Sequence, residues 1–218
     1  MSEKRHSRKY DSTGRQEQAA RTRAHVIAVA GRLFAAKGYA ATSMRAVAAG
    51  AEVSLETVVS TGRKADLLLA AFAAQFAGDP DALSLRSLSP PADPTRPLVL
   101  DAVVGDLVGQ IVPRVADSMG IWRALRVAAE QDAAVAAARR DQARHRRADI
   151  VTHIRALEQA GLVARRTPAE RRALADSLGL VLSHDSYDQL VVVCGWRPAA
   201  YRRWCAATLV ALLRAGWR

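Results

Sequence analysis

The sequence contains little of what marks secreted, membrane-spanning or zinc-binding proteins. Its two cysteines, Cys194 and Cys205, are too few for a disulfide framework or a four-ligand zinc site. No apolar run approaches the ~18–20 residues that a membrane-spanning helix requires. The basic N-terminus is not followed by the apolar segment of a secretory signal. These absences favour a protein of the reducing cytoplasm that has no membrane partner.

Signatures of catalysis are also missing. The sequence shows no nucleophile elbow, no glycine loop that would cradle a phosphate, and no recognisable pair of catalytic carboxylates. His184 and Asp185 adjoin, but no third ligand follows at a convincing metal-binding spacing. We therefore expect a protein that is not an enzyme and that uses no cofactor or metal. A redox-sensing role for the two thiols is an alternative that lacks an electropositive site beside them.

Basic side chains are abundant and unevenly placed. The formal net charge is +11, and residues 1–64 hold 12 of the 32 Lys and Arg but only 5 of the 21 Asp and Glu. This asymmetry favours a polyanionic partner such as nucleic acid for the N-terminal quarter, with a solvated surface as the alternative. A second basic cluster is typical of a solvated helix face; it comprises Arg139, Arg140, Arg144, Arg146 and Arg147.

Apolar residues recur at helical spacing along the chain, and no alternating strand pattern is convincing, so we predict an all-α fold. Capping residues and glycines set the expected helix ends. The expected helices are 16–37, a short helix capped by Thr42 or Ser43, 55–60, 66–76, 100–112, 119–130, 133–159, 168–193 and a last helix after Pro198. Pro113 should end or kink the helix that precedes it.

The expected helices divide into three parts. Residues 1–15 lack apolar periodicity and should form a flexible basic arm, which either enters a minor groove or serves only as a solubilising tail. The remaining helices divide at residue 64 into an N-terminal domain, 16–64, and a larger C-terminal domain, 65–218. Within the latter, residues 78–97 hold five of the eight prolines and are a linker by composition.

The N-terminal helices have the pattern of a helix-turn-helix. Small residues between Ala46 and Ala51 allow two helices to cross closely. The short helix after Ser54 is polar enough to place side chains on base edges in a major groove. Caps at Thr42 and Ser54 direct unpaired backbone N–H groups outward, where phosphates accept them.

These residues resemble the TetR family of bacterial repressors. The resemblance lies in Leu33-Phe34, Lys37-Gly38-Tyr39, Ala41-Thr42-Ser43-Met44-Arg45, Val47-Ala48, Val53-Ser54 and Thr57-Val58. It implies a homodimer whose last two helices form a four-helix bundle with those of the partner. It also implies a small-molecule pocket in the C-terminal domain, whose occupation spreads the two DNA-binding domains. The expected DNA-contacting residues are Thr42, Ser43, Arg45, Ser54, Leu55, Glu56, Thr57, Ser60 and Lys64.

The recognition helix departs from the family pattern in two ways. Val59 and the segment Ser60-Thr61-Gly62 stand where members usually carry a tyrosine and a second aromatic residue. The spacing from Thr57 to Lys64 is also one residue shorter than the common pattern. Gly62 can absorb the tighter turn because glycine tolerates positive φ. We expect the fold to survive these changes and the DNA contacts to differ.

The C-terminal domain offers two candidate sites. Polar residues beside apolar helical stretches suit a ligand pocket, with core or surface positions as the alternative; they are Trp122, Arg126, His153, His184, Asp185 and Tyr187. The apolar stripe of the last helix suits a dimer interface, with ordinary core as the alternative; it comprises Tyr201, Trp204, Cys205, Thr208, Leu209 and Leu212.

The sequence therefore predicts a regulator of transcription. We expect a repressor that binds a palindromic double-stranded DNA operator and is released by a small hydrophobic effector. One alternative is a dimeric DNA-binding regulator without an effector. Another is a helical protein-interaction module that has lost DNA binding, because the two aromatic residues are absent.

Overall fold

A computed structural model describes residues 3–79 and 98–215, with side chains described from residue 14 onward. Within these ranges the chain is all-α and contains no strand, which confirms the predicted fold class. The helices are α1 (Glu3–Ala41), α2 (Met44–Ala51), α3 (Leu55–Thr61), α4 (Lys64–Ala77), α5 (Leu100–Asp117), α6 (Met119–Gln131), α7 (Ala133–Gln159), α8 (Pro168–Val181), α9 (His184–Tyr187), the π-helical segment η2 (Asp188–Val193) and α10 (Pro198–Arg214).

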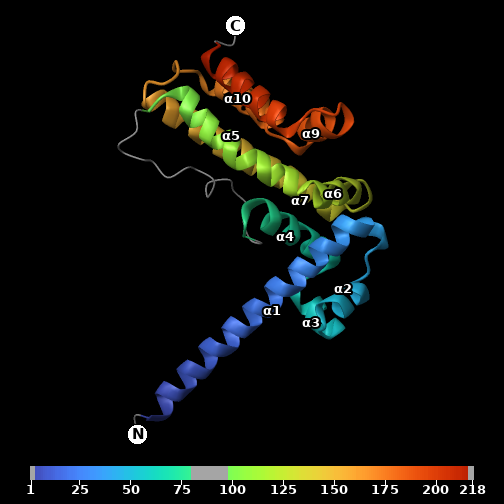
Figure 1. Ribbon diagram of the computed structural model, residues 1–218. Coiled ribbons are helices and arrows are strands. Elements are labelled where there is room, and N and C mark those ends of the chain that lie inside the picture. Colours follow the sequence, from blue (N-terminus) through green and yellow to red (C-terminus); the bar gives the residue numbers. More distant parts are fainter. Residues whose placement is uncertain (1–2, 80–97, 216–218) are drawn as a thin grey trace.

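The helices α2 and α3 lie with α1 at one end of the molecule, and α10 lies at the other (Figure 1). Between them, α4 and α6 connect the N-terminal helices to the long pair α5 and α7. The N-terminal helix-turn-helix and the larger C-terminal helical domain predicted from the sequence are both present. Most of the proposed linker, residues 80–97, lies outside the described residues.

The first helix is longer than predicted. It begins at Glu3, so the segment expected to be a flexible arm is helical from that residue on. Residues 1–15 contain no proline, and extending an existing helix costs far less than nucleating one. The expected break occurs at Gly38, which has φ 79° and ψ 171°.

Local capping chemistry sets the ends of α2, α3 and α8 as predicted. Ser43 caps α2 by accepting a hydrogen bond from the backbone N–H of Ala46, and Ser54 caps α3 through Thr57 N–H. Gly62 ends α3 at φ 153°. Thr167 forms the expected capping box with Glu170 at the start of α8.

Two expected ends of C-terminal helices differ in the structure. Of the two outcomes expected at Pro113, the helix does not end there, because α5 continues to Asp117. The helix expected to run to Val193 ends at Val181. Ser183 interrupts it, because its hydroxyl accepts a hydrogen bond from Ser186 N–H and begins α9.

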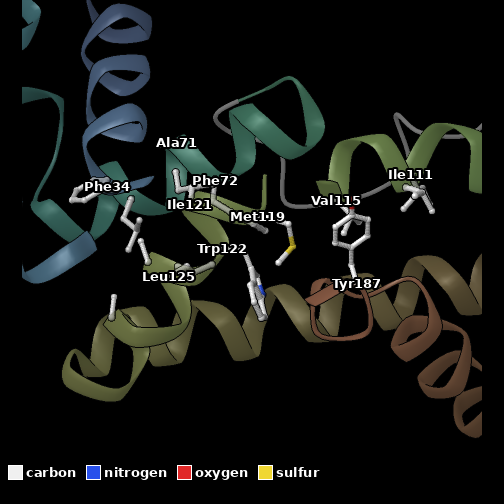
Figure 2. Packing of buried hydrophobic residues seen from close by; sticks show 14 of the residues in the cluster. Phe34, Ala71, Phe72, Ile111, Val115, Met119, Ile121, Trp122, Leu125 and Tyr187 are labelled. Atoms are coloured by element: carbon white, nitrogen blue, oxygen red, sulfur yellow. The ribbon is translucent and has the colours of Figure 1, made fainter. Parts of the chain in front are cut away.

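One hydrophobic core joins both parts of the chain. Phe34 of α1, Ala71 of α4 and Ile121 of α6 are buried in it (Figure 2). The helices α1 and α6 approach closely at a glycine, because a Cβ on Gly120 would lie 3.1 Å from Ala35 Cβ. The N-terminal domain is therefore packed directly on the helical domain.

A buried polar cluster connects the loop after α7 to the end of α10. Arg166, in the loop between α7 and α8, donates hydrogen bonds to the carbonyl oxygens of Leu213 at 2.5 Å and Ala215 at 3.2 Å. Its backbone N–H donates to Glu158 Oε1, and Glu158 also pairs with Arg171 at 2.8 Å. These contacts satisfy carbonyl groups at the end of α10 that have no partner within the helix.

Candidate DNA-binding surface and regulatory cavities

The short helix α3 presents a mixed apolar and polar face to solvent. Val58 is fully buried and anchors the helix. Leu55, Glu56 and Ser60, which the sequence placed among the DNA contacts, are exposed. Val59 is 59% exposed and lies one turn beyond Leu55 on the same side. We did not include Val59 among the predicted contacts, although the i, i+4 spacing from Leu55 would have indicated it.

The hydroxyl groups of α3 bind one another and the helix backbone. Ser54 Oγ lies 2.9 Å from Thr57 Oγ1 and accepts a hydrogen bond from Thr57 N–H at 3.1 Å. Ser60 and Thr61 both donate to the carbonyl oxygen of Thr57 at 2.9 Å. These bonds hold the side chains of a helix that is too short to be stable by itself.

Thr42 does not lie where the resemblance predicted. Its side chain is buried, and Oγ1 lies 2.8 Å from the carbonyl oxygen of Gly38 and 3.3 Å from that of Leu33. The hydroxyl closes the turn after α1 because carbonyls near a helix end need partners. Ser43 and Arg45 are exposed beside it and remain available at the surface.

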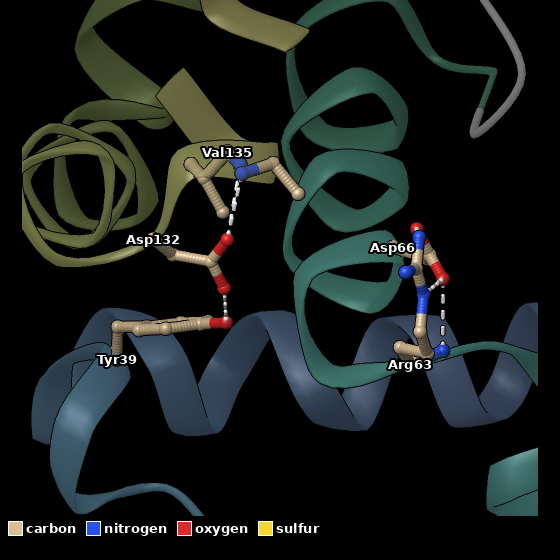
Figure 3. Close-up of polar contacts among 6 residues, drawn as sticks. Tyr39, Arg63, Asp66, Asp132 and Val135 are labelled. Atoms are coloured by element: carbon tan, nitrogen blue, oxygen red, sulfur yellow. Dashed lines mark hydrogen bonds and ion pairs between the residues drawn. The ribbon is translucent and has the colours of Figure 1, made fainter. Parts of the chain in front are cut away.

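The start of α4 is tied to the rest of the protein. The Lys64 ammonium lies 4.4 Å from the centre of the Tyr39 ring and 3.4 Å from the carbonyl oxygen of Ala40, and burial lowers its pKa. Lys64 is thus held against the end of α1. Arg63 pairs with Asp66 at 3.0 Å, as Figure 3 shows, and that hydrogen bond lowers the pKa of Asp66.

A large apolar cavity lies among α5, α7, α8 and α10. Its volume is about 290 Å³. Leu107, Ile154, Leu178 and Leu209 are among the side chains that line it. A cavity of this size and character falls near the lower end of the range for small-molecule sites.

A smaller cavity of about 110 Å³ adjoins it and is built around a buried histidine. The ring of His184 lies 5.4 Å from that of Phe72, 5.3 Å from Phe76 and 5.7 Å from Trp122. Ser118 Oγ lies 2.5 Å from Arg114 O and 2.8 Å from His184 Nε2. Because the single hydroxyl proton goes to the carbonyl, Nε2–H donates to Ser118. Burial, followed by repulsion from Arg146, lowers the pKa of His184 to about 3.

The predicted ligand-binding residues do not form one site. Trp122, His184 and Asp185 line the smaller cavity, and His153 lines the larger one. Arg126 is exposed with its guanidinium 5.2 Å from the Trp122 ring, and Tyr187 is buried edge-on against the Tyr201 ring. The sequence did not indicate Phe72, Phe76 or Arg146 as ligand-binding residues. The two phenylalanines belong to the apolar stripe of their helix, and Arg146 belongs to a cluster of basic residues expected on a solvated face.

The predicted interface stripe on α10 is divided between two faces. Tyr201, Cys205 and Leu209 are buried inside the single chain. Tyr201 donates a hydrogen bond to Val181 O at 3.0 Å, and burial raises the pKa of Cys205 to about 11. Trp204, Thr208 and Leu212 lie on a partly exposed face. The predicted helical spacing of these residues agrees with α10, but α5 and α8 cover half of the stripe.

Exposed apolar side chains occur on neighbouring elements of the same end. Leu180 on α8 is 63% exposed, and Val193 on η2 is 67% exposed. The Trp196 and Trp204 rings meet edge to face at 6.2 Å. A contiguous patch of exposed aliphatic groups marks an interface, whereas single ones are normal on any protein surface. The sequence pattern did not separate these residues from core.

Within residues 3–79 and 98–215, no group of His, Cys, Asp or Glu side chains is arranged to hold a metal ion. None of the helices described is long and apolar enough to cross a membrane.

The fold and the exposed α3 define the class of protein: a helix-turn-helix protein with a larger helical domain behind the DNA-binding head. Residues 26–59 match the model of the bacterial regulatory proteins of the tetR family. The N-terminal helices are therefore similar to the DNA-binding part of this TetR family of transcriptional regulators. The match covers α2 and most of α3, which carry the exposed residues described above.

Comparison with solved structures agrees in fold. The chain is similar to a candidate transcriptional regulator from Pseudomonas aeruginosa PAO1, with a TM-score of 0.66 and 18% sequence identity. The similarity covers 87% of this chain and 89% of that one. No curated protein matches the sequence.

Proposed function

We propose that this chain is a cytoplasmic, non-enzymatic repressor that binds a palindromic operator and leaves it when a small hydrophobic effector binds. The observation that carries the proposal is the face of α3, where Leu55, Glu56 and Val59 are exposed while Val58 anchors the helix. Apolar side chains suit contacts with thymine methyl groups, and Glu56 suits the amino group of cytosine. Arg45 on α2 adds a cation that suits phosphate or guanine.

A homodimer is part of the proposal. The exposed Leu180, Val192 and Val193 and the partly exposed Trp204 support an interface at the end opposite α3. Two recognition helices related by a two-fold axis read inverted half-sites. A regulator without an effector would share the fold but would not need the cavities. A protein-interaction module would share the fold but would not need the exposed α3.

The effector is supported by the cavities beside α4. Phe72 and Phe76 of that helix line the smaller cavity, and the same helix follows directly on α3. A ligand that packed against these rings would bias the position of α4 only if it bound one position better than another.

Fluorescence anisotropy with DNA from upstream of the gene tests the DNA-binding part. We expect sequence-selective binding that weakens steeply with salt. Arg45→Ala should weaken binding by about tenfold, the effect of removing one good contact. The matched control is Arg155→Ala, which removes the same charge from an exposed position on α7 and should have little effect. Equal binding to random DNA by the folded dimer would contradict the proposal.

A further inference from the structure

Arg146 lies where the two cavities meet. It lines both of them, and so does Phe76. A Cβ on Gly179 would lie 3.9 Å from Arg146 Nε and 3.4 Å from Ile150 Cδ1, so this guanidinium lies against α8. The sequence pattern had placed Arg146 on a solvated face of α7. That prediction is wrong for this residue, because α8 covers it.

Arg146 differs from its neighbours in having no partner. Arg144 pairs with Asp141, and Arg147 pairs with Asp176 at 2.5 Å. Among the residues that the structure describes, Arg146 makes no hydrogen bond and no ion pair. A guanidinium stays protonated in proteins. Arg146 is only partly exposed, so its charge is available to a ligand that enters either cavity.

The charges around Arg146 leave room for an anion. Burial lowers its pKa, the carboxylate of Asp185 acts in the opposite direction, and Arg139 adds a like charge. Asp185 is exposed, so solvent weakens its attraction. The smaller cavity therefore carries two arginines, Arg139 and Arg146, against one solvated carboxylate, and the imidazole of His184 beside them is neutral at pH 7.

The larger cavity offers an apolar chamber on the other side of Arg146. Its other polar side chains, Asp149 and His153, are already engaged: His153 Nδ1 lies 2.8 Å from the carbonyl oxygen of Asp149, and both residues make further interactions. Aliphatic side chains form most of the remaining wall. A volume of about 290 Å³ accommodates about ten carbon atoms at roughly 30 Å³ for each water-sized group.

We propose that the effector is an amphipathic monoanion: a carboxylate head that pairs with Arg146, joined to an apolar tail of about ten carbons that fills the larger cavity. The head lies toward Arg139 in the smaller cavity. A carboxylate matches the guanidinium because it can accept two parallel hydrogen bonds. This inference rests on the proposed function for its regulatory meaning, but the binding site stands on the geometry of Arg146 and the cavities.

Isothermal titration calorimetry with three ten-carbon probes tests the head group. Decanoate, decanol and decylamine share the tail and differ in charge, and all are used well below the concentrations at which they form micelles. We expect decanoate to bind at least tenfold more tightly than decanol, a difference of about 1.4 kcal/mol. Decylamine should bind most weakly, because a second cation beside Arg146 is unfavourable.

Two variants locate the effect. Arg146→Gln should remove the preference for decanoate, weakening it by about tenfold or more while changing decanol by less than about threefold. The matched control is Arg144→Gln, which removes the same charge from an exposed site two residues away and should leave all three affinities unchanged. Equal affinity for decanoate and decanol, tighter binding of decylamine, or no binding of any probe would each overturn the proposal.

The outcome is separable from that of the proposed function. If the protein selects operator DNA but binds none of the probes, the amphipathic anion is wrong and the repressor proposal stands. If decanoate binds through Arg146 but no DNA sequence is selected, the site stands and the repressor proposal fails. If both hold, decanoate should lower DNA affinity in the wild type and not in Arg146→Gln.

Discussion

The Tyr39 hydroxyl donates a hydrogen bond to Asp132 Oδ2 at 2.9 Å, joining residues 93 positions apart in the sequence (Figure 3). Tyr39 lies at the end of α1, beside the helix-turn-helix. Asp132 caps α7, where its other oxygen accepts hydrogen bonds from Ala134 and Val135 N–H. A hydrogen bond from one side chain therefore connects the DNA-binding domain to the start of α7, in addition to the packing of α1 on α6.

Removing the Tyr39 hydroxyl should weaken the contact between α1 and the start of α7. Tyr39→Phe keeps the ring, its packing against Phe34 and its contact with Lys64, but loses the bond to Asp132. We expect the melting temperature to fall by about 2–4 °C, the shift for one hydrogen bond in a chain of this size. Differential scanning calorimetry measures it, with Asp132→Asn as the variant that keeps an acceptor. An unchanged melting temperature would show that the contact contributes nothing.

Burial of His184 should make stability depend on pH. Its pKa is about 3 in the folded protein, against 6.5 for an ordinary histidine. Between these values the unfolded chain binds a proton that the folded chain does not, so stability is complete above pH 6.5 and falls as pH drops toward 3. From pH 6.5 to pH 5 the loss is about 2 kcal/mol, at about 1.36 kcal/mol per unit.

Urea unfolding at pH 6.5 and pH 5 checks this value. His184→Gln retains a donor toward Ser118 but does not titrate, so it should lose about 2 kcal/mol less than the wild type over this range. His145→Gln changes an exposed histidine on α7 and should behave as the wild type does. Identical pH dependence in all three proteins would mean that protonation of His184 does not lower the free energy of unfolding.

Two glycines should respond oppositely to alanine. Gly105 lies within α5, and a Cβ there meets nothing within 4 Å, so Gly105→Ala should stabilise by about 0.5–1 kcal/mol. A Cβ on Gly120 would lie 3.1 Å from Ala35 Cβ and 3.7 Å from Ala35 Cα. Gly120→Ala must separate α6 from α1 and should destabilise by about 1–3 kcal/mol. Chemical denaturation measures both, and the same sign of change in both variants would contradict the packing described.

The buried pair of Glu158 and Arg171 should be sensitive to loss of one partner. The Glu158 side chain is 4% exposed and also accepts the Arg166 backbone N–H. Glu158→Gln leaves the Arg171 guanidinium, which is 17% exposed, without its counter-charge. This substitution should destabilise the protein by about 3–5 kcal/mol. Asp141→Asn breaks the exposed pair with Arg144 and should cost less than about 1 kcal/mol. Similar losses in the two variants would show that burial does not decide the cost.

Features that depend on near neighbours in the chain were predictable. Ser43, Ser54 and Thr167 cap their helices by reaching backbone N–H groups three residues ahead, which sequence spacing alone defines. Gly38 interrupts the helical geometry of α1 and Gly62 ends α3, because the positive φ of each glycine is a local property of the backbone. The all-α fold followed from periodicity repeated over many turns.

Features that depend on residues distant in the sequence were not predictable from it. Thr42 faces inward because the carbonyl oxygens of Leu33 and Gly38 approach it in space. Cys205 is core rather than interface because α8 covers it, and periodicity does not say which element covers a stripe. Arg146 was assigned to a solvated face because its sequence neighbours are charged. Only the packing of α8 beside it shows otherwise.

The contacts of Arg166 have a consequence for shortening the chain. Because its guanidinium binds the carbonyl oxygens of Leu213 and Ala215, the end of α10 completes the loop after α7. A deletion that begins at Leu213 would therefore expose a defect about 50 residues earlier in the sequence. Fusion partners at this end should be joined after Ala215, so that α10 and both carbonyl groups are retained.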